Sequence, residues 1–154
     1  GTIVVSDMRE GYSPTHDLAQ ALAQTAIKLS TEGSEATTHL TFPLTGLPGS
    51  TPDGRSPSVT LDLSDAEFEE KVRTARDYEE LAQEVDLLER QGILNSFKTE
   101  LLFPGDKDIL SDEFLEQKPY YETYGEAQVE KGVYKDLLTY SDHLRPLLKH
   151  LDTL

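Results

Sequence analysis

A short polar turn with one histidine is the part of this sequence where chemistry is easiest to place. The stretch EGYSPTHD, residues 10–17, follows a β-branched run and precedes an alanine-rich run. An imidazole close to carboxylates can bind a metal ion or exchange protons near neutral pH. His16 is therefore the candidate metal ligand of this chain. Four nearby side chains would support that ligand or line its pocket: Asp7, Glu10, Tyr12 and Asp17.

A plainer interpretation of the same turn needs no chemistry. Ser13 and Asp17 are of the residue types that cap helix N-termini, and Pro14 suits a turn. His16 would then be a surface residue where a strand connects to a helix. The residues alone leave both interpretations open.

The elements that would position the turn follow from hydrophobic periodicity. Thr2–Asp7 is β-branched and predicts a strand, and Leu18–Leu29 places apolar residues at helical spacing. Thr38–Leu44 predicts a second strand. Strand, helix and strand in this order favour a parallel pair with a crossover helix. We expect an α/β fold, a partial Rossmann-like parallel sheet flanked by helices, with ligands at the carboxyl ends of the strands.

The middle of the chain predicts a long loop, a strand and one long helix. Thr45–Ser58 holds three prolines and three glycines, which predicts a loop. Val59–Leu63 alternates as a strand does. One helix should then begin after Ser64, with Glu67 completing a capping box, and end at Gly92.

The last third is less regular. The segment 97–104 predicts a short strand or extended stretch, and the acidic segment 106–117 favours no single element. From Lys118 the sequence predicts helices broken near Gly125 and Gly132, then a terminal helix around Pro146. No change in composition divides the chain, so we expect a single domain over residues 1–154.

Composition excludes several classes of function. The chain has 154 residues, 14 basic and 29 acidic, and a formal net charge of −15. Such a surface repels phosphate backbones and anionic membranes, so we expect neither nucleic-acid nor membrane partners. The sequence has no cysteine, which excludes disulfides and thiolate metal sites. No run of residues has the length and apolarity of a membrane span or signal peptide, and we expect a cytoplasmic protein.

The remaining histidines and the tyrosines offer weaker sites. His39 falls within the second strand, where a half-buried structural role is expected, and His143 and His150 are seven residues apart, too far to share an ion. Five tyrosines of the C-terminal segment could stack on a sugar or a base, or pack that segment against the rest of the chain. They are Tyr120, Tyr121, Tyr124, Tyr134 and Tyr140.

The strand followed by EGYSPTHD resembles the second half of the LmbE/PIG-L family of zinc-dependent sugar N-deacetylases. In that family a strand ends in an acidic, glycine-containing turn with the pattern His-Pro-Asp-His, followed by an alanine-rich helix. The corresponding residues here are Ser13–His16, preceded by Glu10–Gly11. The stretches 71–85 and 118–147 also look similar to the later part of longer members.

The resemblance implies a zinc site that this chain contains only in part. The second histidine of the family pattern is a zinc ligand and falls on His16. The first, which assists the transition state, falls on Ser13, which cannot do the same acid–base work at neutral pH. The other ligands and the general base come from an Ala-His-Pro-Asp-Asp-Glu motif, and this chain has none.

The functional prediction follows from that partial match. We expect the distal part of a zinc-dependent deacetylase that hydrolyses the amide of an N-acylated, sugar-like substrate and is inactive as this chain alone. In the complete site zinc would polarise the carbonyl and activate water. An upstream segment or a partner chain would supply the missing half. The loop Thr45–Ser58 and the tyrosine-rich tail would shape the sugar side of the pocket.

Two other classes of function remain open from the sequence. The serine at position 13, the absent motif and the −15 charge favour a non-catalytic acidic module that binds proteins or assembles with them. A carbohydrate-binding module is the third hypothesis, and it requires exposed tyrosines.

Overall fold

The computed structural model describes residues 1–30, 37–51, 54–105 and 118–154. The chain forms two compact units, which we call unit 1 (Gly1–Thr45 with Pro104–Leu154) and unit 2 (Gly46–Phe103). Two compact units can belong to one domain or to two, so the assignment of a single domain stays a prediction. The acidic segment 106–117 lies outside the described residues.

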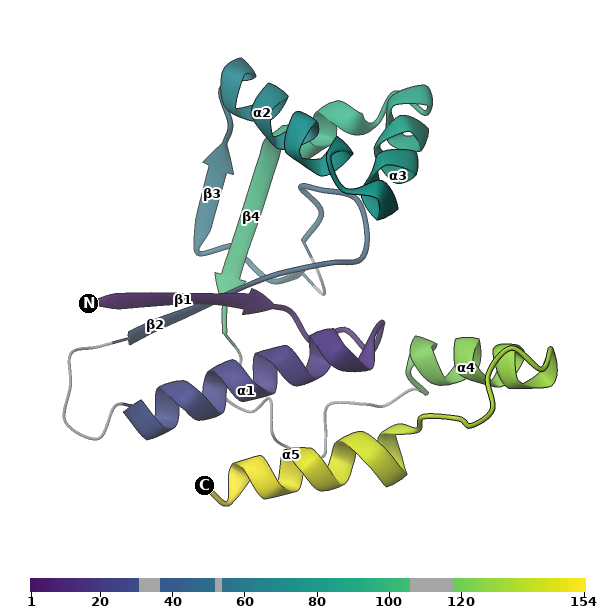
Figure 1. Cartoon of the computed structure of the whole chain (residues 1–154). Helices are drawn as coiled ribbons and strands as arrows, with labels where there is room; N and C mark the ends of the chain where they lie inside the picture. The colour runs from purple at the N-terminus through teal and green to yellow at the C-terminus, as the bar shows by residue number, and fades with distance from the viewer. Residues whose placement is uncertain (31–36, 52–53, 106–117) are drawn as a thin grey trace. The chain divides into compact units, whose positions relative to one another are not determined.

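Unit 1 begins with a parallel strand pair joined by a helix (Figure 1). Strand β1 (Thr2–Asp7) pairs with β2 (Thr37–Phe42) in register from Thr2 opposite Thr37 to Asp7 opposite Phe42. Helix α1 (Pro14–Ser30) lies between them in sequence. The α/β fold predicted from the β-branched runs and the helical run is confirmed, and β1 has the predicted bounds. Strand β2 ends before Pro43, which cannot donate a ladder hydrogen bond.

Helix α1 begins earlier than the sequence indicates, and it buries a different face. It starts at Pro14, so His16 and Asp17 lie in its first turn and not in the preceding loop. Proline is favoured at the first helical position because its missing N–H has no intrahelical acceptor there. The predicted apolar face is only partly right, because Leu22 and Leu29 are exposed. The buried residues of α1 are Asp17, Gln20, Ala21 and Thr25.

The C-terminal part of unit 1 is helical, as predicted. Helix α4 (Tyr120–Glu130) is followed by a π-helical turn, η4 (Tyr140–Leu144), and by α5 (Arg145–Asp152). The predicted break at Gly125 is wrong, because this buried glycine lies inside α4. Its missing side chain makes room for a neighbour, since a Cβ there would lie 2.8 Å from Leu137 Cδ1. The break at Gly132 is confirmed, and this residue has a φ of 72°, a conformation that favours glycine.

The core of unit 1 is small and mixes apolar with polar side chains. Its buried apolar residues come from β2, from Met8 directly after β1, and from α1, α4, η4 and α5, with Leu148 of α5 only 2% exposed. Five polar or charged residues are buried with them: Arg9, Asp17, Gln20, Thr25 and Thr41. Buried polar groups require hydrogen-bond partners, so these residues restrict how the turn after β1 can be arranged.

Unit 2 contains an antiparallel pair and two helices where one helix was expected. Strand β3 (Val59–Asp62) pairs antiparallel with β4 (Thr99–Pro104), whose last residue belongs to unit 1. The expected parallel arrangement is found for β1 with β2 and not for β3 with β4. The predicted long helix is divided into α2 (Asp65–Arg76) and α3 (Glu79–Arg90). A short 3₁₀ helix, η2 (Leu94–Lys98), leads into β4.

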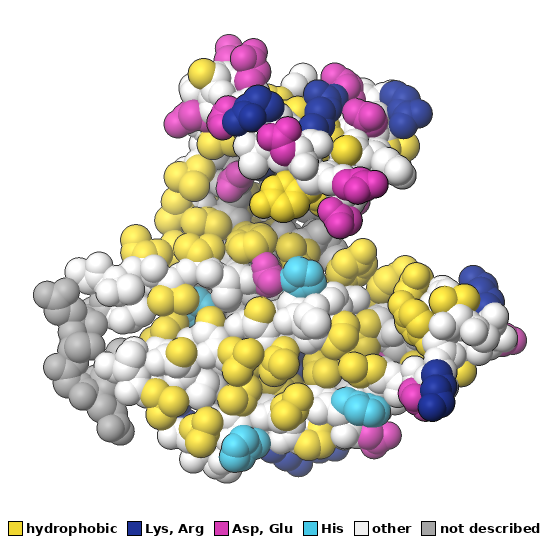
Figure 2. Space-filling model, in the orientation of Figure 1, with side chains coloured by type: hydrophobic (Ala, Val, Ile, Leu, Met, Phe, Trp, Pro, Cys, Tyr) yellow, Lys and Arg dark blue, Asp and Glu magenta, His cyan; other side chains and the backbone are white. Residues whose placement is uncertain are grey.

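The break between α2 and α3 falls at a tyrosine. Tyr78 adopts an extended backbone, with φ −93° and ψ 119°, and its side chain is exposed. Arg76 of α2 then reaches Asp86 and Glu89 of α3 at 3.4 and 2.6 Å. The capping box at the start of α2 is confirmed, since Ser64 and Glu67 bond each other through side chain and backbone. Figure 2 shows acidic and basic side chains mixed over α2 and α3, as expected for a solvated face.

The membrane prediction can be compared with the helices directly. None of the described helices combines the length and the apolar character needed to cross a membrane.

Candidate functional site

The turn between β1 and α1 is fastened to the helix that follows it. Asp17 Oδ1 accepts hydrogen bonds from the backbone N–H groups of Glu10 and Gly11, at 3.0 and 3.1 Å. Gly11 has a φ of 68°, which a residue with a side chain adopts only at a cost. A third bond runs from the Arg9 N–H to the side-chain oxygen of Gln20. Two side chains of α1 therefore fix the path of the turn.

His16 and Asp7 form a pair at the carboxyl end of β1. His16 Nδ1 lies 2.6 Å from Asp7 Oδ2, and the two side chains are 44% and 20% exposed. A carboxylate at Nδ1 favours the tautomer in which Nδ1 carries the proton and Nε2 has a free lone pair. No residue in the described part of the chain hydrogen-bonds to Nε2. The pair could thus offer one nitrogen ligand to a group on its exposed side.

The Glu10 carboxylate bonds the segment after β2, whereas the Asp7 carboxylate contacts His16. Its carboxylate accepts hydrogen bonds from the N–H groups of Leu44 and Thr45, at 2.8 and 3.1 Å, and from the Thr45 hydroxyl at 2.6 Å. Glu10 therefore ties the segment after β2 to the turn after β1. This contact keeps the carboxyl ends of the two parallel strands together.

A buried charged cluster lies behind the turn. Arg9 and Asp17 are each 2% exposed, and the Arg9 guanidinium lies 5.5 Å from the ring centroid of Tyr140. Burial raises the pKa of the Asp17 carboxyl, while the Glu10 and Gly11 N–H groups and the Arg9 charge oppose that rise. Burial also raises the pKa of the Tyr121 hydroxyl, and the Asp17 charge adds to it. The cluster therefore supports the turn from its buried side.

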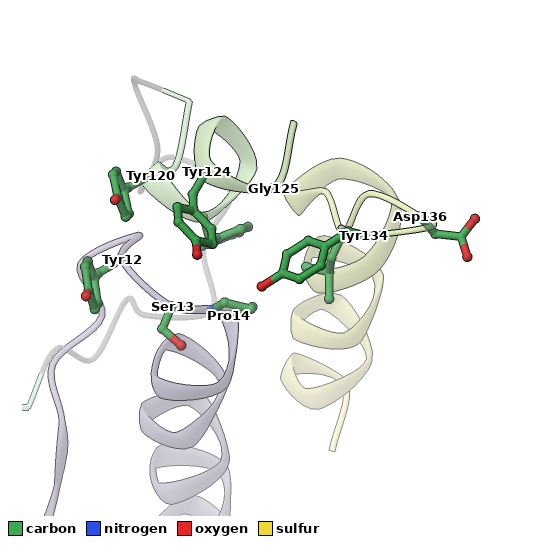
Figure 3. Close-up of a pocket in the computed structure, with 10 residues that line it drawn as sticks. Tyr12, Ser13, Pro14, Tyr120, Tyr124, Gly125, Tyr134 and Asp136 are labelled. Carbon is green, nitrogen blue, oxygen red and sulfur yellow. The ribbon is translucent and has the colours of Figure 1, made fainter. Parts of the chain in front are cut away.

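A cavity of about 430 Å³ opens beside the start of α1. Tyr12 and Ser13 of the turn line it together with Pro14, the first residue of α1. The other walls come from α4 and from the segment after it, as Figure 3 shows. The residues contributed by that part of the chain are Tyr120, Tyr121, Tyr124, Gly125, Tyr134, Asp136 and Leu138.

Four tyrosine rings follow one another along this cavity. Tyr12 and Tyr120 stack with 5.5 Å between ring centroids and only 5° between ring planes. Tyr120 and Tyr124 are 6.1 Å apart, and Tyr124 meets Tyr134 edge-on at 6.4 Å and 67°. Three of the five tyrosines singled out from the sequence therefore join Tyr12 of the turn in one row. The sequence predicts that the tyrosine-rich tail helps to shape the pocket of the site, but it does not predict that Tyr12 of the turn stacks on Tyr120.

The other histidines lie apart from this site. His39 of β2 is half-buried, with Nε2 2.9 Å from Ser6 Oγ and Nδ1 3.0 Å from Gln24 Oε1. Because the Gln24 oxygen can only accept, Nδ1 carries the proton, Nε2 accepts from Ser6, and burial lowers the pKa of His39. This is the structural role expected of His39. His143 belongs to η4, where it accepts the Thr139 N–H at 3.0 Å, and His150 is exposed on α5.

The site residues predicted from the sequence therefore do not form one site, because they make different contacts. Asp7 contacts His16, whereas Glu10 and Asp17 bond backbone N–H groups and Tyr12 and Ser13 line the cavity. Within the described ranges there is no group of three histidine, aspartate or glutamate side chains placed to hold one metal ion. The predicted contribution of the loop Thr45–Ser58 to a pocket stays a prediction.

Comparisons with protein-family models, with curated proteins and with solved structures found no match to this chain. The chemistry of the site consequently rests on its geometry.

Proposed function

We propose that this chain is the distal part of a deacetylase-type hydrolase that cleaves the amide of an N-acylated, sugar-like substrate. The observation that supports this most directly is the pair of His16 and Asp7 at the carboxyl end of β1. In α/β sheets that end of the strands is where ligands bind. A carboxylate that holds Nδ1 of a histidine is the usual support for a metal ligand at Nε2.

The described residues do not make a complete zinc site. A catalytic zinc ion is normally held by three protein ligands and keeps a fourth position for water or substrate. His16 would be one ligand, and the described ranges bring no further pair of donors to it. No zinc-dependent step can therefore be assigned to these residues alone. The role proposed for this chain is to supply one supported ligand and one wall of the substrate pocket.

The exposure of β1 favours the hypothesis that a further segment or chain packs against this strand. Among the described strands β1 pairs only with β2, so one edge of β1 has no described partner. Ile3 and Val5, on one face of this strand, are 65% and 47% exposed. Parallel sheets are normally covered on both faces, and their strands are rich in such residues because they are buried. An upstream segment of the chain or a partner chain would bury this edge and complete the site.

Zinc binding tests the proposal. The protein that includes the sequence encoded upstream of Gly1 should bind one zinc ion per chain and hydrolyse an N-acetyl sugar amide. His16→Ala should lower zinc affinity by at least about 100-fold, and Asp7→Asn by roughly 10–100-fold, because Asp7 acts through the ligand. His150→Ala, on the exposed surface of α5, is the matched control and should leave zinc affinity unchanged.

Two results would contradict the proposal. One is a longer protein that takes up no zinc. The other is unchanged zinc affinity in the His16→Ala variant. A chain without metal that instead forms a stable complex with a basic protein would support the second candidate, a non-catalytic acidic module. The specific observation in favour of that candidate is Ser13, whose hydroxyl lies 2.9 Å from Thr15 Oγ1 at the position where a working deacetylase has histidine.

A further inference from the structure

The tyrosine-lined cavity has the chemistry of a site for an organic cation. Its walls include the rings of Tyr12, Tyr120, Tyr124 and Tyr134, and its volume of about 430 Å³ falls within the range of small-molecule sites. The face of an aromatic ring carries partial negative charge, so a cation placed against it is attracted. Several ring faces that enclose one space add their attraction.

The rings that line the cavity are inclined to one another and do not form one flat wall. Tyr124 and Tyr134 meet at 67°, whereas Tyr120 is tilted by 33° from Tyr124. A roughly tetrahedral group such as trimethylammonium can touch faces that are inclined to one another, which a flat ring cannot do at once. Figure 3 shows the Tyr124 and Tyr134 hydroxyls directed toward Ser13 and Pro14, at the base of the cavity. Those hydroxyls can hydrogen-bond a polar substituent of the ligand.

Charge around the cavity also favours a cation. Asp136 is the charged residue among those that line it, and no lysine or arginine is among them. Figure 3 shows the Asp136 carboxylate at the outer end, pointing away from the rings, so it would attract a cation to the rim without contacting it. The net charge of −15 acts in the same direction.

The start of α1 does not reverse this preference. A helix N-terminus normally favours anions, because its first N–H groups point outward. Here Pro14 at the first position has no N–H, and Asp17 places a carboxyl group in the first turn. One of the first N–H groups is therefore missing and a carboxyl group lies nearby, so this helix start attracts anions less than an ordinary one does.

We propose that the cavity between the start of α1 and helix α4 binds a small quaternary ammonium compound of the choline type. The trimethylammonium group would contact the faces of Tyr120, Tyr124 and Tyr134. Its hydroxylated arm would lie toward the Tyr124 hydroxyl and Ser13. This site needs no metal and does not depend on the proposed deacetylase function.

Choline and its uncharged analogue 3,3-dimethylbutan-1-ol test the proposal on the wild-type chain. The two have the same shape and differ in charge, so hydrophobic filling of the cavity would bind both alike. We expect choline to bind at least about tenfold more tightly, as judged by calorimetry and by shifts of the tyrosine ring signals in NMR spectra. Equal binding of the two, or no binding of choline at millimolar concentration, would overturn the proposal.

Ring variants locate the site. Tyr124→Phe keeps the ring but loses the hydroxyl that faces the hydroxylated arm, so it should weaken choline binding by about two- to fivefold. Tyr124→Leu also loses the ring face and should weaken it at least about tenfold. Tyr78→Leu, an exposed tyrosine of unit 2, is the control and should bind like wild type. Unchanged choline affinity in a folded Tyr124→Leu variant would refute this placement.

Two further ligands test whether the cavity prefers free choline to a phosphorylated choline or to a neutral sugar. Phosphocholine carries a phosphate next to the ammonium group, and the acidic rim should weaken its binding relative to free choline. Tighter binding of phosphocholine would overturn the assignment to a free choline-type compound. Methyl glucoside supplies hydroxyls without charge, and its binding in place of choline would assign the cavity to neutral sugars and contradict the proposal.

Discussion

Replacing Asp17 by alanine would test how the turn after β1 is held. Asp17 Oδ1 accepts the N–H groups of Glu10 and Gly11, and both Asp17 and Gly11 are buried. Leaving one buried donor without a partner costs about 1–3 kcal/mol. Because Glu10 is only half-buried and water can replace part of its bond, we expect Asp17→Ala to lower the free energy of unfolding by about 2–5 kcal/mol.

Asparagine at the same position separates the hydrogen bonds from the charge. Its side-chain oxygen can replace Oδ1 as acceptor for both N–H groups. Burial raises the pKa of the Asp17 carboxyl, which means that its ionised form is less favourable in the folded protein than in water. An uncharged amide avoids this cost, although it also removes the attraction to Arg9. We therefore expect Asp17→Asn to cost less than about 1 kcal/mol.

Urea denaturation followed by tyrosine fluorescence is the suitable assay. Every tyrosine except Tyr78 belongs to unit 1, so this signal reports mainly on the unit that contains Asp17. Glu130→Gln, at the exposed end of α4, removes one carboxylate without touching the turn and is the control. If Asp17→Ala and Asp17→Asn lose the same stability, or both stay within about 0.5 kcal/mol of the control, the reasoning about the turn is refuted.

The pH dependence gives an independent check on Asp17. Its pKa in the folded protein lies above the ordinary value of 3.8. In the window from 3.8 up to that raised value the folded state binds more protons than the unfolded state. Stability from this group therefore falls as pH rises through the window and is level above it. Asp17→Asn should remove this contribution. The free energy of unfolding of the wild type, minus that of the variant, should therefore increase toward acid pH.

Three more predictions concern packing and capping, and each is measured as the free energy of unfolding in urea. Gly105→Ala should cost about 1–3 kcal/mol, because its Cβ would overlap the His39 ring at Nδ1, and a cost below about 0.5 kcal/mol would contradict the close approach. Ser64→Ala should cost about 1 kcal/mol through loss of the capping box with Glu67, and an unchanged midpoint by circular dichroism would argue against that cap. Leu148→Ala should cost about 2–5 kcal/mol, since this side chain is only 2% exposed, and a surface-like loss would show that it is not part of the core.

Local signals in the sequence were sufficient for several elements. The β-branched run Thr2–Asp7 became β1 with the same bounds, and the capping box at Ser64 and Glu67 began α2 where it was predicted. These features depend on neighbouring residues only, so the chain can specify them without reference to the rest of the fold. The parallel pairing of β1 and β2 followed from the order of the elements.

Other features depended on contacts between distant residues. Nothing at Tyr78 marks a helix end, since neither glycine nor proline is present, yet α2 ends before it and Arg76 reaches across to α3. The low helix propensity of glycine predicts a helix break at Gly125. Instead this glycine lies inside α4, because Leu137 packs against the space that a side chain would fill.

The candidate site shows the same division. The sequence by itself determined which residue types could do chemistry, namely the histidine and carboxylates of EGYSPTHD and the tyrosines of the tail. Only the tertiary structure decided that Asp7 contacts His16, that Asp17 is buried against backbone N–H groups, and that Tyr12 stacks on Tyr120. The physical reason is that a residue's type fixes what its side chain can bond. Which partner it meets depends on packing between elements far apart in the chain, and no local pattern records that packing.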